Sequence, residues 1–227
     1  MAKTFFVTGT DTDAGKTLIA CGILAAAKRA GLSTAAVKPV AAGCEQTSKG
    51  LRNADALALL AQSTKPLAYE QVNPVALLPA IAPHIAAAQV GRELRVNRLL
   101  GLCRGVVYER ADLTLIEGAG GWRVPLNNTE TLADLARELD QPVILVVGMK
   151  LGCINHALLT FEAILRDGLA VAGWVANAVQ ADMAVFDENL ATLRQRLPAP
   201  LLGVVPHFSA PSAEQAAEHL DLAPLGL

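Results

Sequence analysis

Residues 9–17 are the first that could do chemistry, because they combine glycines, a lysine and a threonine at a recognisable spacing. They read GTDTDAGKT, which ends like a phosphate-binding loop but does not begin like one. The usual pattern, G-x-x-x-x-G-K-[S/T], would place a glycine where this chain has Thr10. An apolar run precedes the stretch and a helical pattern follows it, as a phosphate loop requires. A glycine-rich turn that only caps a helix is the less favoured alternative.

Each group in this loop has an expected role. Backbone N–H groups from Ala14 to Thr17 would face phosphates at the N-terminus of the helix. Lys16 would reach the β- and γ-phosphates, and the Thr17 hydroxyl would hold Mg²⁺. We expect the Lys16 side chain to face solvent until a phosphate binds. The loop therefore predicts a site for a nucleotide phosphate chain with its metal.

Three polar residues near the ends of other elements are further candidates. Lys38 follows an apolar run and would point into the crevice, with a surface lysine as the alternative. Asp55 follows Asn53, a candidate helix N-cap, and by itself is explained by the helix dipole. Glu117 closes the run LTLIE before a glycine-rich turn, where an acid commonly serves the metal; a solvated acid is the alternative.

Short apolar runs alternate with longer helical patterns along the whole chain. Strands are expected over residues 4–8, 34–39, 113–117, 142–148, 171–176 and 201–205. Helices are expected over residues 16–30, 53–61, 92–109, 131–139, 154–166 and 186–197. This alternation predicts an α/β fold, with a mostly parallel sheet between two helical layers and ligands at the carboxyl ends of its strands. Residues 66–83 are expected to leave the sheet as an irregular excursion, and residues 1–227 to form one domain.

The composition excludes several classes of protein. The chain has 227 residues, of which 52% are hydrophobic and 18% charged, so it is globular rather than disordered. Its 19 basic and 21 acidic residues give a net charge of −2, which offers no electrostatic case for binding nucleic acid or an anionic membrane. Four widely spaced cysteines without a CxxC pair indicate reduced thiols, and no signal segment opens the chain. We therefore expect a cytoplasmic location.

The motifs, taken in order, resemble the dethiobiotin synthetase family. They are GTDTDAGKT, KPVAAG, LRNADAL, NPVALLPAIAPHIAA, IEGAGG, PVILVVGMKLGCINH, GWVANAV and LLGVVP. The resemblance implies a phosphate-loop fold and a homodimer. It also implies an enzyme that joins CO₂ to 7,8-diaminopelargonate and forms the ureido ring of dethiobiotin, while ATP becomes ADP and phosphate.

The resemblance also implies residue roles. The catalytic residues would be Lys38, Lys16 and Thr12, and the Mg²⁺ ligands would be Thr17, Asp55 and Glu117. ATP and its metal would contact Asp13, Ala14, Gly15, Lys16, Thr17, Leu18, Asp55, Glu117, Gly118, Ala119, Gly120, Asn177, Val205, Pro206 and His207. The substrate would contact Thr12, Lys38, Ala42, Gly152, Cys153, Ile154 and Asn155, the last four from the partner subunit. By itself, the turn at residues 150–156 is a second anion site or an ordinary strand-to-helix turn.

Two residues of the chain, Ala42 and Asp13, depart from the pattern of the family. Ala42 stands where the family often has a hydroxyl, for which Cys44 or a backbone group would have to compensate, and Asp13 stands where many members have glutamate. We expect Asp11 to brace the loop or to help fix it beside a cationic substrate.

Partition and division-site ATPases of similar fold carry a lysine at the position of Asp11. Related amidotransferases need a glutaminase domain, for which 227 residues leave no room.

Overall fold

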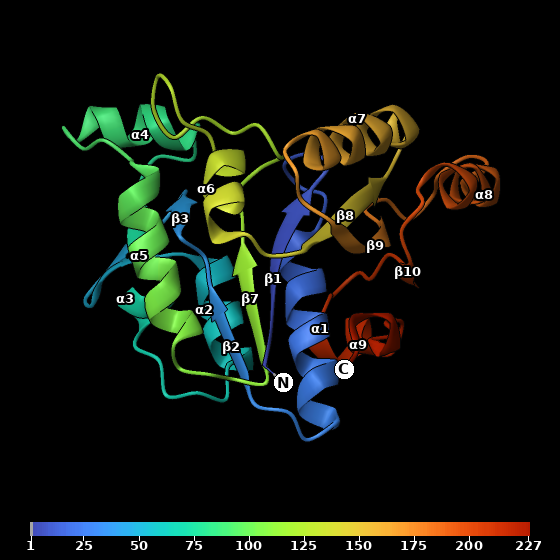
Figure 1. The fold of residues 1–227 in the computed structure, drawn as a ribbon, viewed down its shortest axis with the longest axis horizontal. Coiled ribbons are helices and arrows are strands. Elements are labelled where there is room, and N and C mark those ends of the chain that lie inside the picture. Colours follow the sequence, from blue (N-terminus) through green and yellow to red (C-terminus); the bar gives the residue numbers. More distant parts are fainter. Residues whose placement is uncertain (1) are drawn as a thin grey trace.

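The centre of the fold is a six-stranded parallel sheet (Figure 1). The computed structural model describes residues 2–227. The sheet strands are β1 (Lys3–Gly9), β2 (Thr34–Val37), β7 (Leu113–Glu117), β8 (Val143–Met149), β9 (Val171–Ala178) and β10 (Leu201–Val205). Their spatial order is β10-β9-β8-β1-β7-β2, and all neighbours are parallel. The six predicted strands and the α/β class are confirmed, with small shifts at the strand ends.

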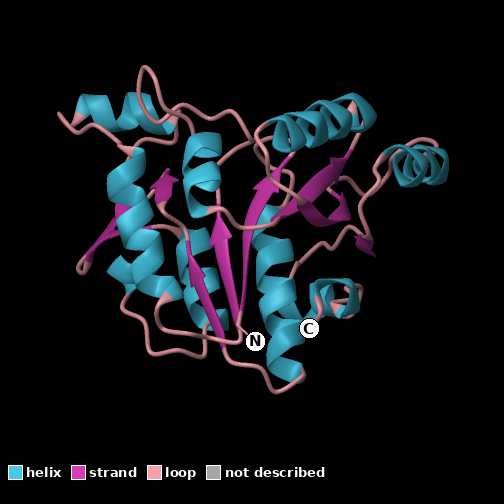
Figure 2. Cartoon of the chain, viewed as in Figure 1, coloured by secondary structure: helices cyan, strands magenta, loops and turns pink. Residues whose placement is uncertain are grey.

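Helices cover both faces of this sheet (Figure 2). The six predicted helices appear as α1 (Lys16–Arg29), α2 (Ala54–Gln62), α5 (Val96–Val107), α6 (Leu132–Leu139), α7 (Cys153–Arg166) and α8 (Phe186–Arg196). Helix α1 packs against α2 and against a short C-terminal helix, α9 (Ala213–Ala217), whereas α5 packs against α6 and α7 against α8. The chain moves toward β2 after α1 but toward β10 after α6. Because such crossovers are right-handed, the two groups of helices lie on opposite faces.

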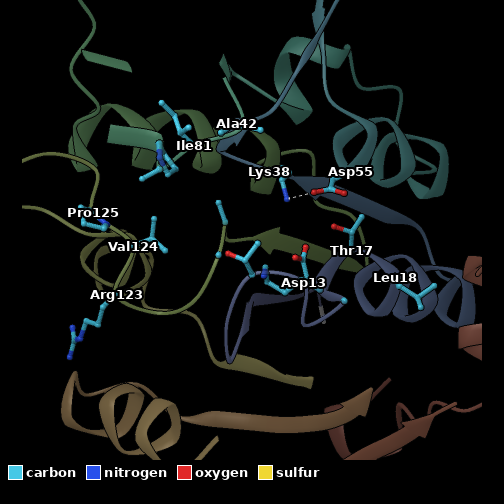
Figure 3. A pocket seen from close by; sticks show the side chains of 18 residues that line it. Asp13, Thr17, Leu18, Lys38, Ala42, Asp55, Ile81, Arg123, Val124 and Pro125 are labelled. Atoms are coloured by element: carbon cyan, nitrogen blue, oxygen red, sulfur yellow. Dashed lines mark ion pairs between the residues drawn. The ribbon is translucent and has the colours of Figure 1, made fainter. Parts of the chain in front are cut away.

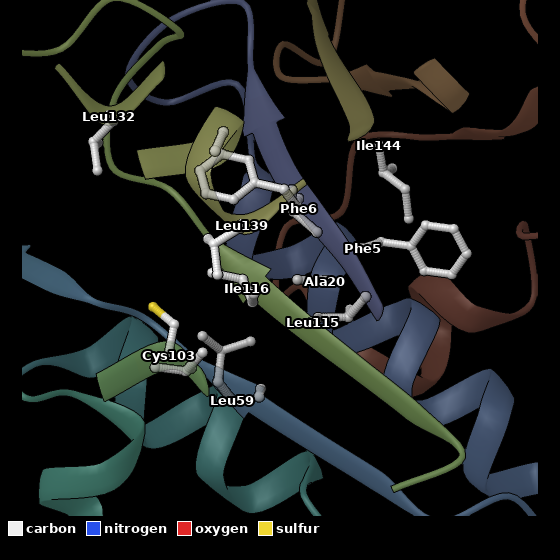
Figure 4. Packing of buried hydrophobic residues seen from close by; sticks show 14 of the residues in the cluster. Phe5, Phe6, Ala20, Leu59, Cys103, Leu115, Ile116, Leu132, Leu139 and Ile144 are labelled. Atoms are coloured by element: carbon white, nitrogen blue, oxygen red, sulfur yellow. The ribbon is translucent and has the colours of Figure 1, made fainter. Parts of the chain in front are cut away.

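The double covering explains why the strands are apolar along their whole length. Phe5 and Phe6 are consecutive in β1, and Figure 4 shows their rings on opposite sides of the strand, as the period of two requires. Both rings are buried in one large cluster formed by both helical layers. A smaller cluster around Trp174 lies beneath α7 and α8. A run such as Val143–Met149 therefore meets no solvent on either face.

The chain between β2 and α5 is more ordered than expected. It contains β3 (Val40–Ala42), β4 (Glu45–Thr47), β5 (Gly50–Arg52), α3 (Tyr69–Val72), β6 (Val75–Leu77) and α4 (Pro83–Gln89). Strands β3 and β6 pair in parallel, and β4 and β5 form a hairpin. The expected irregular excursion at residues 66–83 thus includes α3 and β6. These elements have three to seven residues each and were missed because they are too short to show a period, as are α9 and the 3₁₀ helix Ala223–Leu225.

Parallel strands bring their carboxyl ends to one edge of the sheet, and that edge positions the site. Val7 of β1 lies beside Glu117 of β7, and Val37 of β2 lies beside Ile116. The loops that follow β1, β2 and β7 therefore meet. Among the helices formed by residues 2–227, none is long and apolar enough to cross a membrane.

Candidate active site

The phosphate-binding loop joins β1 to α1 and leaves the helix N-terminus open. Gly15 is the N-cap, with a φ of 85°, and no side chain caps the helix. This left-handed conformation favours glycine, and a Cβ at Gly15 would collide with the amide of Asn177. The first N–H groups of α1 are therefore available to an anion, which is the arrangement predicted for this loop.

Lys16 corrects one expectation. Its side chain does not face solvent: the residue is only 7% exposed, and Nζ donates a hydrogen bond to the Asp11 carbonyl oxygen at 3.0 Å. The expectation failed because the loop folds back over the side chain and supplies a backbone partner for it. Burial lowers the pKa of Lys16, an effect that Glu117 opposes by favouring the charged form. The ammonium group still lines the cavity described below.

Lys38 lies between two acids directly after β2. Its Nζ lies 2.5 Å from Oε1 of Glu117 and 2.9 Å from Oδ2 of Asp55. Lys38 and Glu117 are both buried, so the alternatives of a surface lysine and a solvated acid are wrong. Burial alone would lower the pKa of Lys38, but the Glu117 and Asp55 carboxylates outweigh it and raise the pKa above its usual value. The three side chains form a charged cluster at the sheet edge.

The oxygen atoms around Glu117 fit a magnesium ion. The Thr17 hydroxyl donates to Oε1 of Glu117 at 2.8 Å, while Oε2 of Glu117 is buried and has no hydrogen-bond partner. Asp55, which is partly exposed, adds a second carboxylate to the cluster. Across residues 2–227 no group of three or more His, Cys, Asp or Glu side chains could hold a metal. Two carboxylates with a hydroxyl suit Mg²⁺, which keeps several of its waters.

A cavity of about 710 Å³ lies over these groups (Figure 3). Leu18 lies at one end and Arg123, Val124 and Pro125 lie at the other, with Lys38 between them. The predicted site residues that line it are Thr12, Asp13, Gly15, Lys16, Thr17, Leu18, Lys38, Ala42, Asp55, Ala119 and Gly120. The structure thus brings together residues from the loops after β1, β2 and β7 and from α2.

Two parts of the cavity wall were missed by sequence reasoning. They are residues 80–83, between β6 and α4, and residues 123–125, after the glycine-rich turn. Ala80, Ile81, Val124 and Pro125 have apolar side chains, which bear no chemical signature. The only available signal was that the NPVALLPAIAPHIAA segment contributes to the family resemblance. Arg123 follows the glycine-rich turn closely enough to have been considered.

The residues predicted around the nucleotide base lie at the ends of β9 and β10. Asn177 is buried, and its Nδ2 donates to the Ala14 carbonyl oxygen at 3.0 Å, while its Oδ1 has no partner. Val205 is buried at the end of β10, and Pro206 and His207 are exposed just beyond it. Gly118 lies beside β1, with its N–H bonded to the Val7 carbonyl oxygen. None of these residues lines the cavity itself.

The turn that opens α7 is separate from this cavity. Gly152 is its N-cap, with a φ of 94°. Cys153 is buried, so its thiol does not face solvent. Its N–H donates to the Lys150 carbonyl oxygen at 2.9 Å and is therefore already bonded. Ile154 is half-buried and Asn155 is exposed. These four residues lie outside the cavity of their own chain.

The two remaining questions from the sequence concern Asp11 and Ala42. Asp11 Oδ2 accepts from Lys150 Nζ at 2.5 Å, so this acid links the phosphate loop to the segment after β8. This pairing agrees with the bracing role expected of Asp11. Ala42 lines the cavity, and the neighbouring Cys44 thiol donates to the Ala41 carbonyl oxygen at 3.6 Å. The thiol is therefore already engaged with the backbone.

The fold and this cluster define a phosphate-loop nucleotide-binding protein of the α/β class. A family model described as "AAA domain" matches residues 3–215, so the chain belongs to that family. The ParA family ATPase of Chlorobium tepidum TLS has a similar fold, with a TM-score of 0.60, 11% identity and 100% coverage of both chains. A chain of the MinC:MinD cell division complex of Aquifex aeolicus has a TM-score of 0.58 and 13% identity, covering 97% of this chain and 88% of that one. Identities this low support the fold alone.

Similarity to curated sequences defines the family more closely. "ATP-dependent dethiobiotin synthetase BioD" of Cellvibrio japonicus is 67% identical over 98% of this chain and 97% of its own length. The protein of that name from Pseudomonas aeruginosa (strain UCBPP-PA14) is 64% identical over 98% of each chain. That of Aeromonas hydrophila is 48% identical over 99% of this chain and 100% of its own. The chain belongs to the dethiobiotin synthetase family, which confirms the resemblance.

Proposed function

We propose that this chain uses ATP to join CO₂ to 7,8-diaminopelargonate and to close the ureido ring of dethiobiotin, in the cavity between the phosphate loop and Lys38. It is thus an ATP-dependent ligase that forms C–N bonds. The observation that carries the proposal is that Lys38 and Thr17 bond to the same oxygen of Glu117. Lys38 is expected to act on the acceptor, and the Thr17 hydroxyl on the metal–nucleotide complex. Both groups thus contact the same carboxylate oxygen. Such proximity is what phosphoryl transfer requires.

The nucleotide would lie along the phosphate loop. Its phosphates would accept hydrogen bonds from the N-terminus of α1 and from Lys16, whose ammonium lines the cavity. The unpaired Oδ1 of buried Asn177 supports a contact with the exocyclic amino group of adenine, because that oxygen has no other donor. The other proposed contacts to ATP are Asp13, Ala14, Gly15, Leu18, Gly118, Ala119, Gly120, Val205, Pro206 and His207.

Mg²⁺, the usual partner of ATP in phosphate-loop enzymes, would be held by Thr17, Asp55 and Glu117. It would supply positive charge beside the phosphates when bound. The free Oε2 of Glu117 supports this assignment, since a buried carboxylate oxygen without a partner carries a desolvation cost that a cation would remove. A magnesium ion directly bound to Glu117, or bound through water, satisfies the same requirement.

The proposed reaction has three steps. A neutral amine of the substrate adds to CO₂, loses a proton and gives a carbamate. A carbamate oxygen attacks the γ-phosphorus of ATP, ADP leaves, and a carbamic–phosphoric anhydride remains. The second amine attacks the anhydride carbonyl, loses its proton and expels phosphate, which closes the ring. Lys38 and Lys16 would stabilise negative charge on the carbamate and the γ-phosphate, and the Thr12 hydroxyl, at the cavity wall, would hydrogen-bond a reacting group.

The substrate carboxylate would be bound by a second subunit. We assign it to Gly152, Cys153, Ile154 and Asn155 of the partner in a homodimer, with Ala42 on the near wall. Three leucines along α7 and its turn support a protein interface there: Leu151 is 95% exposed, Leu159 58% and Leu165 49%. Exposed apolar side chains gathered on one element are typical of such interfaces. A twofold axis would place the turn of each subunit beside the cavity of the other.

We further propose a cytoplasmic enzyme with one domain over residues 1–227. Cys21, Cys44, Cys103 and Cys153 are free and buried, which suits a reducing compartment. One continuous sheet runs through the fold and supports a single domain. The net charge of −2 supports neither nucleic acid nor an anionic membrane as a partner.

The test is ADP release with and without diaminopelargonate and bicarbonate. We expect ADP to form at an appreciable rate only when both compounds are present, and Lys38→Ala to abolish that release. Lys49→Ala, at an exposed lysine of the β4–β5 hairpin, is the matched control and should behave like the parent. Release that ignores both compounds would indicate a nucleotide-driven switch of the ParA kind.

A further inference from the structure

One acid at the far end of α7 holds the wall of the cavity that follows β7. Asp167 is the C-cap of α7 and its side chain is 11% exposed. Its Oδ2 accepts from Trp122 Nε1 at 2.7 Å and lies 2.8 Å from Nη1 of Arg123, and its Oδ1 accepts from Nη2 of Arg123 at 2.9 Å. Both carboxylate oxygens are thus occupied by two consecutive residues of a single loop. Such two-pronged pairs with arginine are geometrically specific.

Asp167 lies at the C-terminus of α7, so its carboxylate needs stabilising partners from outside that helix. A negative charge at the C-terminus of a helix is disfavoured by the helix dipole. The helix therefore does not stabilise the Asp167 carboxylate, whose hydrogen-bond partners all lie in the loop after β7. Trp122, itself buried, also packs edge-on against Phe6 of β1 with ring centroids 6.0 Å apart. The loop is held from the sheet on one side and from Asp167 on the other.

The held loop is part of the candidate active site. Arg123 and two apolar neighbours, Val124 and Pro125, form the end of the cavity remote from Leu18 (Figure 3). The same loop also lies against the phosphate loop: a Cβ on Gly121 would meet the Thr10 carbonyl oxygen at 3.4 Å. The loop therefore has little space in which to move while its two anchors hold.

We propose that Asp167 is a positioning residue that sets the acceptor end of the cavity through Trp122 and Arg123. The bidentate pair also keeps the Arg123 guanidinium turned toward α7. Loss of the carboxylate releases the guanidinium and leaves the indole N–H without its partner, so the wall at residues 123–125 loosens. The nucleotide end is built mainly by α1 and the phosphate loop, neither of which bonds to the Asp167 side chain. The assignment of the remote end to the acceptor rests on the proposed function.

Hydrogen exchange tests the anchoring directly and needs no substrate. In Asp167→Ala, peptides covering residues 121–125 should exchange faster than in the parent, while peptides from α1 should be unchanged. Glu218→Ala is the matched control, because Glu218 is also a C-cap acid but makes no ion pair or side-chain hydrogen bond among residues 2–227. If Asp167→Ala does not fold, Asp167→Asn, which keeps one acceptor oxygen, takes its place. Unchanged exchange in this loop would overturn the proposal.

Kinetics tests the consequence. Asp167→Ala should raise KM for diaminopelargonate about tenfold, with KM for ATP and kcat within about a factor of two of the parent. For Asp167→Asn, KM for diaminopelargonate should lie between the values of the parent and of Asp167→Ala. Equal rises in both KM values would refute a role confined to the acceptor end. If the parent protein does not turn over diaminopelargonate at all, the proposed function fails, and the exchange measurement still decides whether Asp167 holds the loop.

Discussion

The nucleotide end of the proposed site and the turn that opens α7 differ in how completely one chain builds them. At the nucleotide end Lys16, Lys38 and Glu117 are buried and bonded to one another or to the backbone. At the turn, Asn155 is exposed and Leu151 is almost fully exposed to solvent. Both are helix N-termini with a left-handed glycine as N-cap. The first lies in the cavity described above, and the second lies outside it.

The difference shows that an N-terminus alone does not make a site. Around α1 the neighbouring strands add a lysine and a carboxylate, and the cavity wall would enclose a bound anion. The turn before α7 lies outside this cavity, and the neighbouring Leu151 is exposed. A second subunit would supply the enclosure.

The largest effect is expected at the nucleotide end. Lys16→Ala should lower kcat by about two decades or more, because it removes a positive charge that stabilises the transferring phosphoryl group. The fold should persist, because the mutation removes an ammonium group whose burial is itself costly. Steady-state kinetics and circular dichroism provide the measurements, and Lys28→Ala, at the exposed end of the same helix, is the control. A variant with normal kcat and an unchanged spectrum would contradict the phosphate-loop assignment.

Glu117→Gln tests the metal at the same end. A neutral amide replaces the carboxylate that bonds Thr17 and Lys38, so the Mg²⁺ concentration for half-maximal activity should rise about tenfold. The midpoint of thermal unfolding should also fall, because buried Lys38 keeps only Asp55 as a counter-charge. Glu109→Gln, at an exposed glutamate just after α5, is the control. Superimposable Mg²⁺ titrations would leave Glu117 with a structural role only.

Mixing two inactive variants tests whether the turn serves the partner subunit. Lys38→Ala damages the cavity, and a bulky replacement at Gly152 blocks the turn and strains its left-handed backbone. After complete subunit exchange at equal concentrations, half of the dimers are mixed and each keeps one intact site. We expect activity to return to about a quarter of the parent value.

Subunit exchange must be shown separately, for example by pull-down of an untagged variant with a tagged one. A mixture that exchanges and stays as inactive as its components would mean that each turn serves its own chain. The same pull-down on the parent protein establishes whether the dimer exists.

The smallest effect is expected from Asn155→Ala. It should raise KM for diaminopelargonate several-fold and leave KM for ATP unchanged, because it removes binding remote from the reacting atoms. Asn97→Ala is the control, since Asn97 is also an exposed asparagine in the first turn of a helix. A rise in KM for ATP alone would place the turn at the nucleotide instead.

The long, strongly patterned parts of this structure could be predicted from sequence. The six sheet strands and six longer helices were found because each is either continuously apolar or periodic over many residues. The phosphate loop was found because backbone geometry demands glycine and the chemistry demands lysine and threonine at set spacings. By contrast, β3 to β6 are three residues each, and their pairing depends on contacts distant in sequence.

The site could be predicted in residue type but not in environment. Lys38 and Glu117 were identified individually, but their direct ion pair depends on β2 and β7 being neighbours, which no local pattern reveals. Lys16 was expected in solvent because nothing in its neighbours shows that the Asp11 carbonyl oxygen would accept from it. Residues 80–83 were missed because apolar side chains at a cavity wall look like any other apolar side chains.

The proposed reaction inserts a carbon atom from CO₂ between the two amines of diaminopelargonate at the expense of ATP. Its most direct test is mass spectrometry of the product formed from ¹³C-bicarbonate, with ADP measured in the same sample. We expect dethiobiotin with a single heavy carbon in its ureido carbonyl, in equal amount to the ADP formed, and none from Lys38→Ala. ADP formed without labelled dethiobiotin would contradict it.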